Sequence, residues 1–127
     1  MASRTSNFCI DAADPWAQVR WWAQVLDDFR LVEDPEMGPD AEECWLVGPD
    51  DREIIFLRVP EPKTVKNRMH VCVRPTDRSR EEEVDRIVAL GATVVDDRRE
   101  GPEKGWAVLA DPEGNEFCVL TRYTPST

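Results

Sequence analysis

The feature that most constrains this chain is an internal repeat, in which the second half follows the first at a constant spacing of 63 residues. Identical residues recur at this spacing without a gap: Cys9 and Cys72, Asp14 and Asp77, Leu46 and Leu109, Pro49 and Pro112, Glu53 and Glu116, and Leu57 and Leu120. A repeat of this length is a supersecondary unit of several strands and helices, written twice.

Each half is predicted to run strand, helix, strand, strand, strand. We expect strands at 6–12, 29–32, 44–47 and 53–59, and a helix that begins after the capping residue Asp14. The second half predicts strands at 69–74, 92–96, 106–110 and 116–121, and a helix between the capping box Ser79–Glu82 and Gly91. The sequence therefore predicts an α+β fold of tandem βαβββ modules.

The modules are expected to form one domain over residues 1–127, with module one at about 6–60, a linker at 61–68 and module two at about 69–122. Apolar residues recur at helical spacing in the first predicted helix. That period favours Trp16 and Trp22 as core residues.

Composition excludes several classes of partner and location. The formal net charge of −10 argues against nucleic acid and anionic membranes as partners. No apolar run approaches the roughly 20 residues that span a bilayer, and no secretion signal is evident. The four cysteines, Cys9, Cys44, Cys72 and Cys118, form no CxxC motif. We therefore expect a cytoplasmic protein with reduced thiols.

The repeat places the only histidine, His70, opposite Asn7, and it places Glu53 opposite Glu116. If the modules pack about a pseudo-twofold axis, we expect these four side chains to converge on one point. Strand alternation puts them on one face together with Cys9, Cys72 and Cys118. The more apolar opposite face, with Phe8, Ile10, Ile54, Phe56, Val71, Val73, Phe117 and Val119, is expected under the helices. The first face is then an open, concave ligand cleft.

The tandem arrangement and three segments, DPWAQVRWWAQVLDDF, KNRMHVCVRP and LADPEGNEFCVL, resemble the vicinal-oxygen-chelate (VOC) superfamily. The resemblance is greatest to its glyoxalase-like domains of the bleomycin resistance type, and it covers nearly the whole chain. Asp27 departs from the family pattern, in which Gly is usual. The resemblance implies the glyoxalase/bleomycin resistance/extradiol dioxygenase fold and a homodimer, but the superfamily hosts several reactions and plain binding proteins.

By resemblance, the candidate metal ligands are His70, Glu53, Glu116 and Asn7, which would hold one divalent ion such as Ni, Zn, Mn, Co or Fe. Asn7 departs from the family pattern, because it offers only an amide oxygen where a strong ligand is usual. The cofactor prediction is therefore either none or one such metal.

Each candidate also has a simpler interpretation. His70 could be a strand histidine that contacts a ligand directly, Glu116 could pair at its strand start, and Glu53 could be a solvated turn carboxylate. Cations that could neutralise the carboxylates are Arg74, Lys63, Lys66 and Arg68. Trp45 and Trp106 follow loops and could stack on a flat ligand. The predicted ligand-binding residues are Asn7, Trp45, His70, Cys72, Arg74, Trp106 and Cys118.

Two main functions follow. The first is a metal-free protein that binds a small hydrophobic or flat molecule in the cleft, as in resistance or sequestration. The alternative is a divalent-metal-dependent lyase or isomerase that resembles glyoxalase I, in which Glu53 or Glu116 moves a proton. A structural or partner-binding role is a third possibility. Whether the chain is an enzyme stays open at this point.

Overall fold

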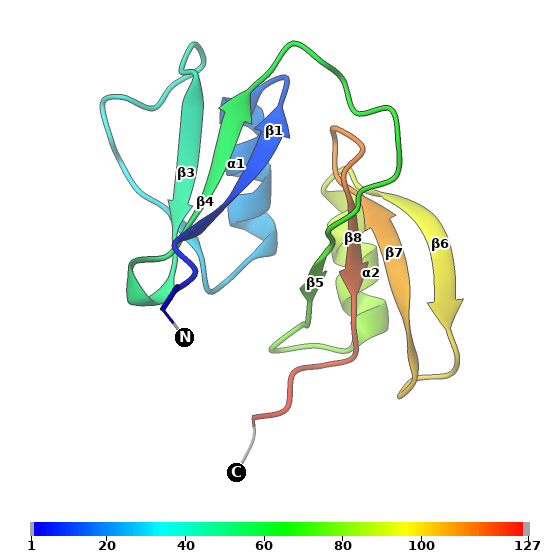
Figure 1. Ribbon diagram of the computed structural model, residues 1–127. Helices are drawn as coiled ribbons and strands as arrows, with labels where there is room; N and C mark the ends of the chain where they lie inside the picture. Colours follow the sequence, from blue (N-terminus) through cyan, green and yellow to red (C-terminus); the bar gives the residue numbers. More distant parts are fainter. Residues whose placement is uncertain (1, 126–127) are drawn as a thin grey trace. The chain divides into compact units, whose positions relative to one another are not determined.

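The computed structural model describes residues 2–125, and the chain divides into two compact units, Met1–Pro62 and Lys63–Thr127. Each unit contains one α-helix and one four-stranded sheet (Figure 1). The division lies within the predicted linker. That the two units form one domain stays a prediction.

The first unit contains β1 (Asn7–Ala12), α1 (Pro15–Val25), β2 (Arg30–Leu31), β3 (Glu43–Val47), a short 3-10 helix (Pro49–Asp51) and β4 (Glu53–Arg58). Its strands lie in the order β1-β4-β3-β2. β1 runs parallel to β4, whereas the other neighbours are antiparallel.

The second unit contains β5 (Val71–Val73), α2 (Arg80–Ala89), β6 (Thr93–Arg99), β7 (Gly105–Ala110) and β8 (Glu116–Val119). Its order, β5-β8-β7-β6, is the first sheet repeated, again with one parallel pair. The predicted α+β fold and element order are therefore confirmed.

Strand register obeys the 63-residue repeat. Ile54 of β4 pairs with Phe8 on one side and Leu46 on the other. In the second unit Phe117 of β8 pairs in the same way with Val71 and Leu109. Register is fixed wherever one sheet face is buried, because a slip of one residue would move every apolar side chain to the other face.

The helix starts do not follow the repeat. Asp14 caps α1 by accepting a hydrogen bond from Ala17 N at 3.1 Å. α2 is capped two residues later than the repeat implies, by the predicted box of Ser79 and Glu82. Asp77 instead pairs with Arg78, so its identity with Asp14 reflects no shared role.

One face of each sheet is buried, and the helix of that unit packs near it (Figure 1). The buried side chains include Cys44, Leu46, Ile54 and Phe56 in the first unit and Leu109, Phe117 and Val119 in the second. Ile55 and Leu57, on the other face of β4, are half-buried. Phe8 is an exception to the predicted face, since it is 51% exposed on the edge strand β1.

Most strands end within two residues of the prediction, and β6 and β5 differ from it most. β6 continues to Arg99 because its last residues pair with β7, Arg98 with Trp106 and Arg99 with Gly105. Its charged side chains also pair along the strand, Asp96 with Arg98 at 2.7 Å and Asp97 with Arg99 at 2.8 Å. β5 begins only at Val71, after a segment tied to other groups by hydrogen bonds. In residues 2–125 no helix is long and apolar enough to cross a membrane.

Candidate functional site

Asn7 and Glu53 face each other at the start of the parallel pair β1 and β4. Both residues are half-buried. Asn7 Nδ2 donates a hydrogen bond to Cys9 Sγ at 3.2 Å, along its own strand. The register thus brings these two candidate residues together within the first unit.

The open face of the first sheet carries an aromatic and apolar row. Cys9, Ile55 and Trp45 occupy partner positions on β1, β4 and β3. Trp45 and Ile55 are half-buried, and Cys9 is exposed. A row of this kind offers a flat apolar ligand a surface for stacking, next to the polar groups of Asn7 and Glu53.

Glu116 is the most strongly held candidate residue in the second unit. Its Oε1 accepts a hydrogen bond from Lys63 Nζ at 3.0 Å, and its Oε2 accepts one from the backbone N–H of Asn67 at 3.1 Å. Burial raises the pKa of Glu116, but the two hydrogen bonds outweigh it and hold the pKa below its ordinary value. Of the cations named from the sequence, Lys63 is the one that neutralises this carboxylate.

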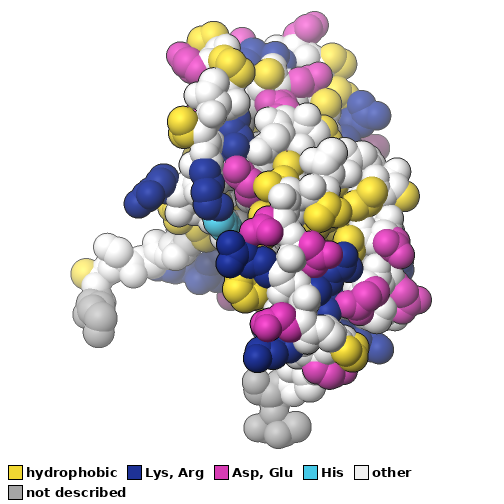
Figure 2. Space-filling view, turned by 90° about the vertical axis from the view of Figure 1, so that its right-hand side faces the viewer, with side chains coloured by type: hydrophobic (Ala, Val, Ile, Leu, Met, Phe, Trp, Pro, Cys, Tyr) yellow, Lys and Arg dark blue, Asp and Glu magenta, His cyan; other side chains and the backbone are white. Residues whose placement is uncertain are grey.

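His70 lies one residue before β5 and is exposed. Its Nε2 lies 3.1 Å from Asn67 O and 3.5 Å from Lys66 Nζ. In Figure 2 the histidine lies beside Lys or Arg side chains on the surface, as the contact with Lys66 requires. The imidazole is therefore held by the same segment that holds Glu116.

These contacts test whether a divalent metal fits the second unit. The Glu116 carboxylate contacts one ammonium group, and the nearest cation to His70 Nε2 is another. A metal ion there would be repelled by both lysines and would have to displace the Lys63 bond. Within neither unit, over residues 2–125, do three His, Cys, Asp or Glu side chains gather in a way that could hold a metal. The donors as they lie do not fit a metal within one unit, and convergence of the pair Asn7–Glu53 with the pair His70–Glu116 stays a prediction.

Cys72 and Cys118 are partners on β5 and β8. Cys72 is exposed, whereas Cys118 is 7% exposed. Burial raises the pKa of the Cys118 thiol, and the adjacent Cys72, which hydrogen-bonds to it, raises it further. A thiol with a raised pKa is a poor nucleophile at neutral pH, so the geometry favours a lining role over covalent catalysis by Cys118.

The two remaining predicted ligand residues, Trp106 and Arg74, differ in whether their side chains are available to contact a ligand. Trp106 is 39% exposed on β7, on the same face as Val108, the partner of Cys118. Arg74 is bound to the segment that follows β8, because its Nη1 donates to Thr121 O at 3.0 Å and to Thr121 Oγ1 at 2.9 Å. Trp106 can therefore receive a ligand, whereas Arg74 serves first to fix the end of its strand.

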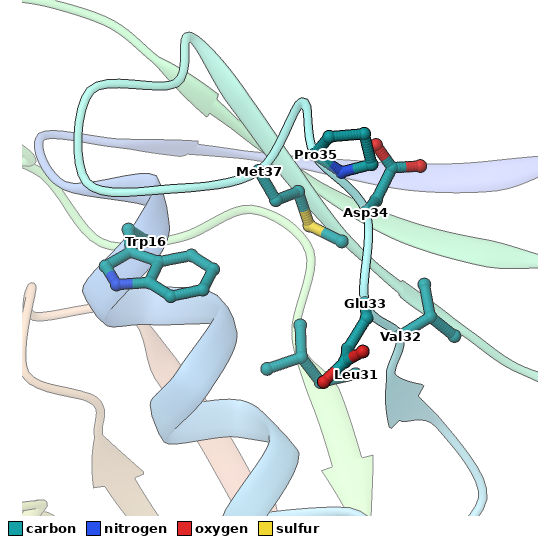
Figure 3. Close-up of a pocket in the computed structure, with 7 residues that line it drawn as sticks. All are labelled: Trp16, Leu31, Val32, Glu33, Asp34, Pro35 and Met37. Atoms are coloured by element: carbon teal, nitrogen blue, oxygen red, sulfur yellow. The ribbon is translucent and has the colours of Figure 1, made fainter.

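Sequence reasoning missed a pocket of about 720 Å³ in the first unit. It is lined by Trp16, Leu31, Val32, Glu33, Asp34, Pro35 and Met37 (Figure 3). The core prediction is right for Trp22, which is 3% exposed, but wrong for Trp16, which is half-buried at the start of α1. The helical period marks the direction of a side chain, but it does not show whether the sheet extends far enough to cover it.

Comparison with known proteins agrees with this geometry. Residues 7–120 match the family described as glyoxalase-like domain. No curated protein sequence matches the chain.

Among solved structures, the chain is similar to the fosfomycin resistance protein FosX from Mesorhizobium loti, with 16% identity, a TM-score of 0.68 and coverage of 97% of this chain and 94% of that one. FosX from Listeria monocytogenes, complexed with Mn(II) and sulfate, gives 15% identity, a TM-score of 0.68 and coverage of 97% and 93%. TnmS3, an antibiotic binding protein from Streptomyces sp. CB03234, gives 19% identity, a TM-score of 0.64 and coverage of 94% and 97%. These likenesses confirm the predicted fold. The family match, which spans nearly the whole chain, shows that this protein belongs to the glyoxalase-like domain family, within the VOC superfamily.

Proposed function

We propose that this protein binds a small, flat, hydrophobic molecule on its open sheet faces and releases it chemically unchanged, as a resistance or sequestration protein does. The observation that carries the proposal is the row of Cys9, Ile55 and Trp45 across three strands. Polar groups of Asn7 and Glu53 lie one pleat away on the same face and would orient the ligand. The name of TnmS3, an antibiotic binding protein, supports the same kind of function.

The state of Glu116 also supports binding over catalysis. A general base must be free to accept a proton, yet both oxygens of this carboxylate already accept hydrogen bonds. The same bonds lower its pKa and so its basicity. Within its unit, Glu116 is a carboxylate in a fixed position that would line a ligand site without accepting a proton.

The test uses 2-naphthol and flavone, two neutral planar molecules, and isothermal titration calorimetry with the reduced full-length chain. Trp45→Ala should weaken binding by about tenfold or more, because one stacked ring contributes about 1 kcal/mol or more beyond its buried area. The matched control is Phe8→Ala, which removes an exposed aromatic ring from the opposite face of the same sheet. Equal affinities for wild type and Trp45→Ala would refute the proposal. So would a ligand recovered in altered form.

A metal-dependent lyase or isomerase is the second candidate. It is favoured by the placement of Asn7 with Glu53 and by the complex of Listeria FosX with Mn(II). The ligands would be His70, Glu53 and Glu116, and the Lys63 contact with Glu116 stands against them. Plasma mass spectrometry of protein purified without chelators decides the matter: one divalent metal per chain, lost in His70→Ala, would support this candidate and refute a metal-free protein.

Two further features belong to the proposal. We infer a homodimer, by resemblance to the family, which light scattering after size exclusion will test. We also infer a cytoplasmic location, where the four free cysteines would stay reduced.

A further inference from the structure

The two cysteines of the second sheet have a geometry that their counterparts in the first sheet lack. Cys72 and Cys118 are register partners on the neighbouring parallel strands β5 and β8 (Figure 1). Neighbouring strands lie about 4.8 Å apart, and partner residues project from the same face. The Cα atoms of a disulfide lie about 4.4–6.8 Å apart, and the spacing of neighbouring strands falls within this range.

The thiols also meet the requirements of contact and access. Register places their side chains next to each other on one face of the sheet. Cys72 is exposed, so a small oxidant can reach it, while Cys118 is 7% exposed and is protected from direct attack. One accessible thiol beside one protected thiol is the arrangement of a peroxidatic and a resolving cysteine.

We propose that Cys72 and Cys118 form an oxidation site, where a hydroperoxide converts the two thiols into a cross-strand disulfide. The Cys72 thiolate attacks the terminal peroxide oxygen, the O–O bond breaks, and Cys72 becomes a sulfenic acid while water or an alcohol leaves. Cys118 is a weak nucleophile toward a free substrate, but its sulfur is held beside the sulfenic acid by register, so the attack on the Cys72 sulfur is intramolecular. The S–S bond forms, the S–O bond breaks, and the oxygen leaves as water with the Cys118 proton. Two thiols lose two electrons and two protons in total, and the peroxide takes up both.

The product would change the second unit in a defined way. β5 is an edge strand of three residues that pairs with β8 alone. A disulfide across this pair ties the edge strand to the sheet and closes a long chain segment between the two cysteines, which stabilises the folded state by restricting the unfolded one. Glu116 lies two residues before Cys118 on β8, and His70 lies two residues before Cys72, just outside β5, so the disulfide also fixes the start of both segments.

The repeat supplies an internal control. Cys9 occupies the position of Cys72 in the first sheet and is likewise exposed, but its partner on β4 is Ile55. Cys9 therefore has the same accessibility to peroxide and no resolving thiol opposite. If strand register determines the reaction, peroxide should form a disulfide at Cys72 and none at Cys9.

The experiment treats the reduced full-length protein with a small excess of hydrogen peroxide, followed by alkylation and mass spectrometry. We expect a loss of about 2 Da, consistent with two thiols becoming one disulfide. Trypsin should release one cross-linked product, 69–78 joined to 105–122, since Pro75 blocks cleavage after Arg74. Dithiothreitol should separate the two peptides, and the oxidised protein should unfold at a higher urea concentration than the reduced one.

Variants make the test specific. Cys9→Ser should oxidise as the wild type does, whereas Cys72→Ser should form no intramolecular disulfide and should keep its native circular dichroism spectrum. Ile55→Cys should add a second cross-strand disulfide, to Cys9, if register governs the reaction. A stable gain of oxygen on Cys72 in the wild type, a cross-link between two chains, a bond that involves Cys9, or no reaction at all would each overturn the proposal.

Discussion

The Nζ atom of Lys63 lies 3.0 Å from Oε1 of Glu116, with 22% and 11% of the two side chains exposed. Lys63 is the first residue of the second unit, and Glu116 opens β8. The pair therefore fastens the segment before β5 to the sheet. It also determines what Glu116 can do chemically, because an ion-paired carboxylate is a weak base and a poor metal ligand.

Lys63→Met should lower the free energy of unfolding at pH 7 by about 0.5–1 kcal/mol, the range for a partly exposed ion pair. The folded-state pKa of Glu116 lies below its value of 4.5 in the unfolded chain. Its contribution is therefore fully present above about pH 5 and is lost as the pH falls through the folded pKa. Urea denaturation at pH 7 and pH 3 measures the difference, which should shrink at the lower pH. A difference that stays constant would show that Lys63 acts through packing alone.

The two tryptophans of α1 should respond differently to truncation. Trp22 is 3% exposed, so Trp22→Ala should lower the free energy of unfolding by about 3–5 kcal/mol. Trp16 lines the pocket, with Arg20 5.6 Å from its ring centroid, and Trp16→Ala should cost only about 1 kcal/mol. Thermal unfolding followed by circular dichroism compares the pair. Equal losses would place Trp16 in the core after all.

The fold could be predicted because its signals are local or repeated. The capping box at Ser79 and Glu82 needs no tertiary information, and it appears where expected. The repeat then fixes register, since Leu46–Ile54 and Leu109–Phe117 bury the same face in each sheet. Few other strand registers would place the apolar face of each sheet under the helix of its unit.

The parts that could not be predicted depend on distances in space. The charged residues from Asp97 to Arg99 resemble a loop in composition, yet their pairing with β7 keeps them in β6. Similarly, the sequence offered four cations for Glu116, and only the folded chain selects Lys63. In the first unit, the repeat could mark Asn7 and Glu53 as candidate positions, and the register places them opposite each other. The pocket beside Trp16 could not be predicted, because it depends on the path of the loop after β2.

Gly105 should be irreplaceable, whereas Gly101, four residues earlier, should not. Both have positive φ, +85° and +78°, so an alanine at either position is strained by about 1–2 kcal/mol. A Cβ on Gly105 would also clash with the carbonyl oxygen of Arg98, while one on Gly101 would meet nothing within 4 Å. We expect Gly105→Ala to lower the free energy of unfolding by about 3 kcal/mol or more. Urea denaturation of both variants checks this, and equal losses would exclude the clash.

The last prediction tests whether the two pairs of polar strand residues converge, as the repeat predicts. The background is Lys63→Met, which removes the ammonium group from Glu116. In this background Asn7→His adds a second imidazole at the strand position that otherwise offers only an amide. If the pairs converge, affinity for Ni²⁺ or Zn²⁺ in equilibrium dialysis should rise by at least about tenfold, because imidazole is a far better ligand than amide oxygen for these ions.

The matched control for this experiment is Asp11→His in the same background. Asp11 lies on the same face of β1 as Asn7, but four residues further along, which is about 13 Å in an extended strand. It would add the same imidazole to the same sheet beyond the reach of the other ligands. A gain in affinity for Asn7→His alone that is lost when His70→Ala is added would establish convergence, because the new imidazole could otherwise bind the metal with Glu53, its register partner in the first unit. Equal affinities for the two variants would mean that the pairs remain separate, and the metal-dependent candidate would fail with them.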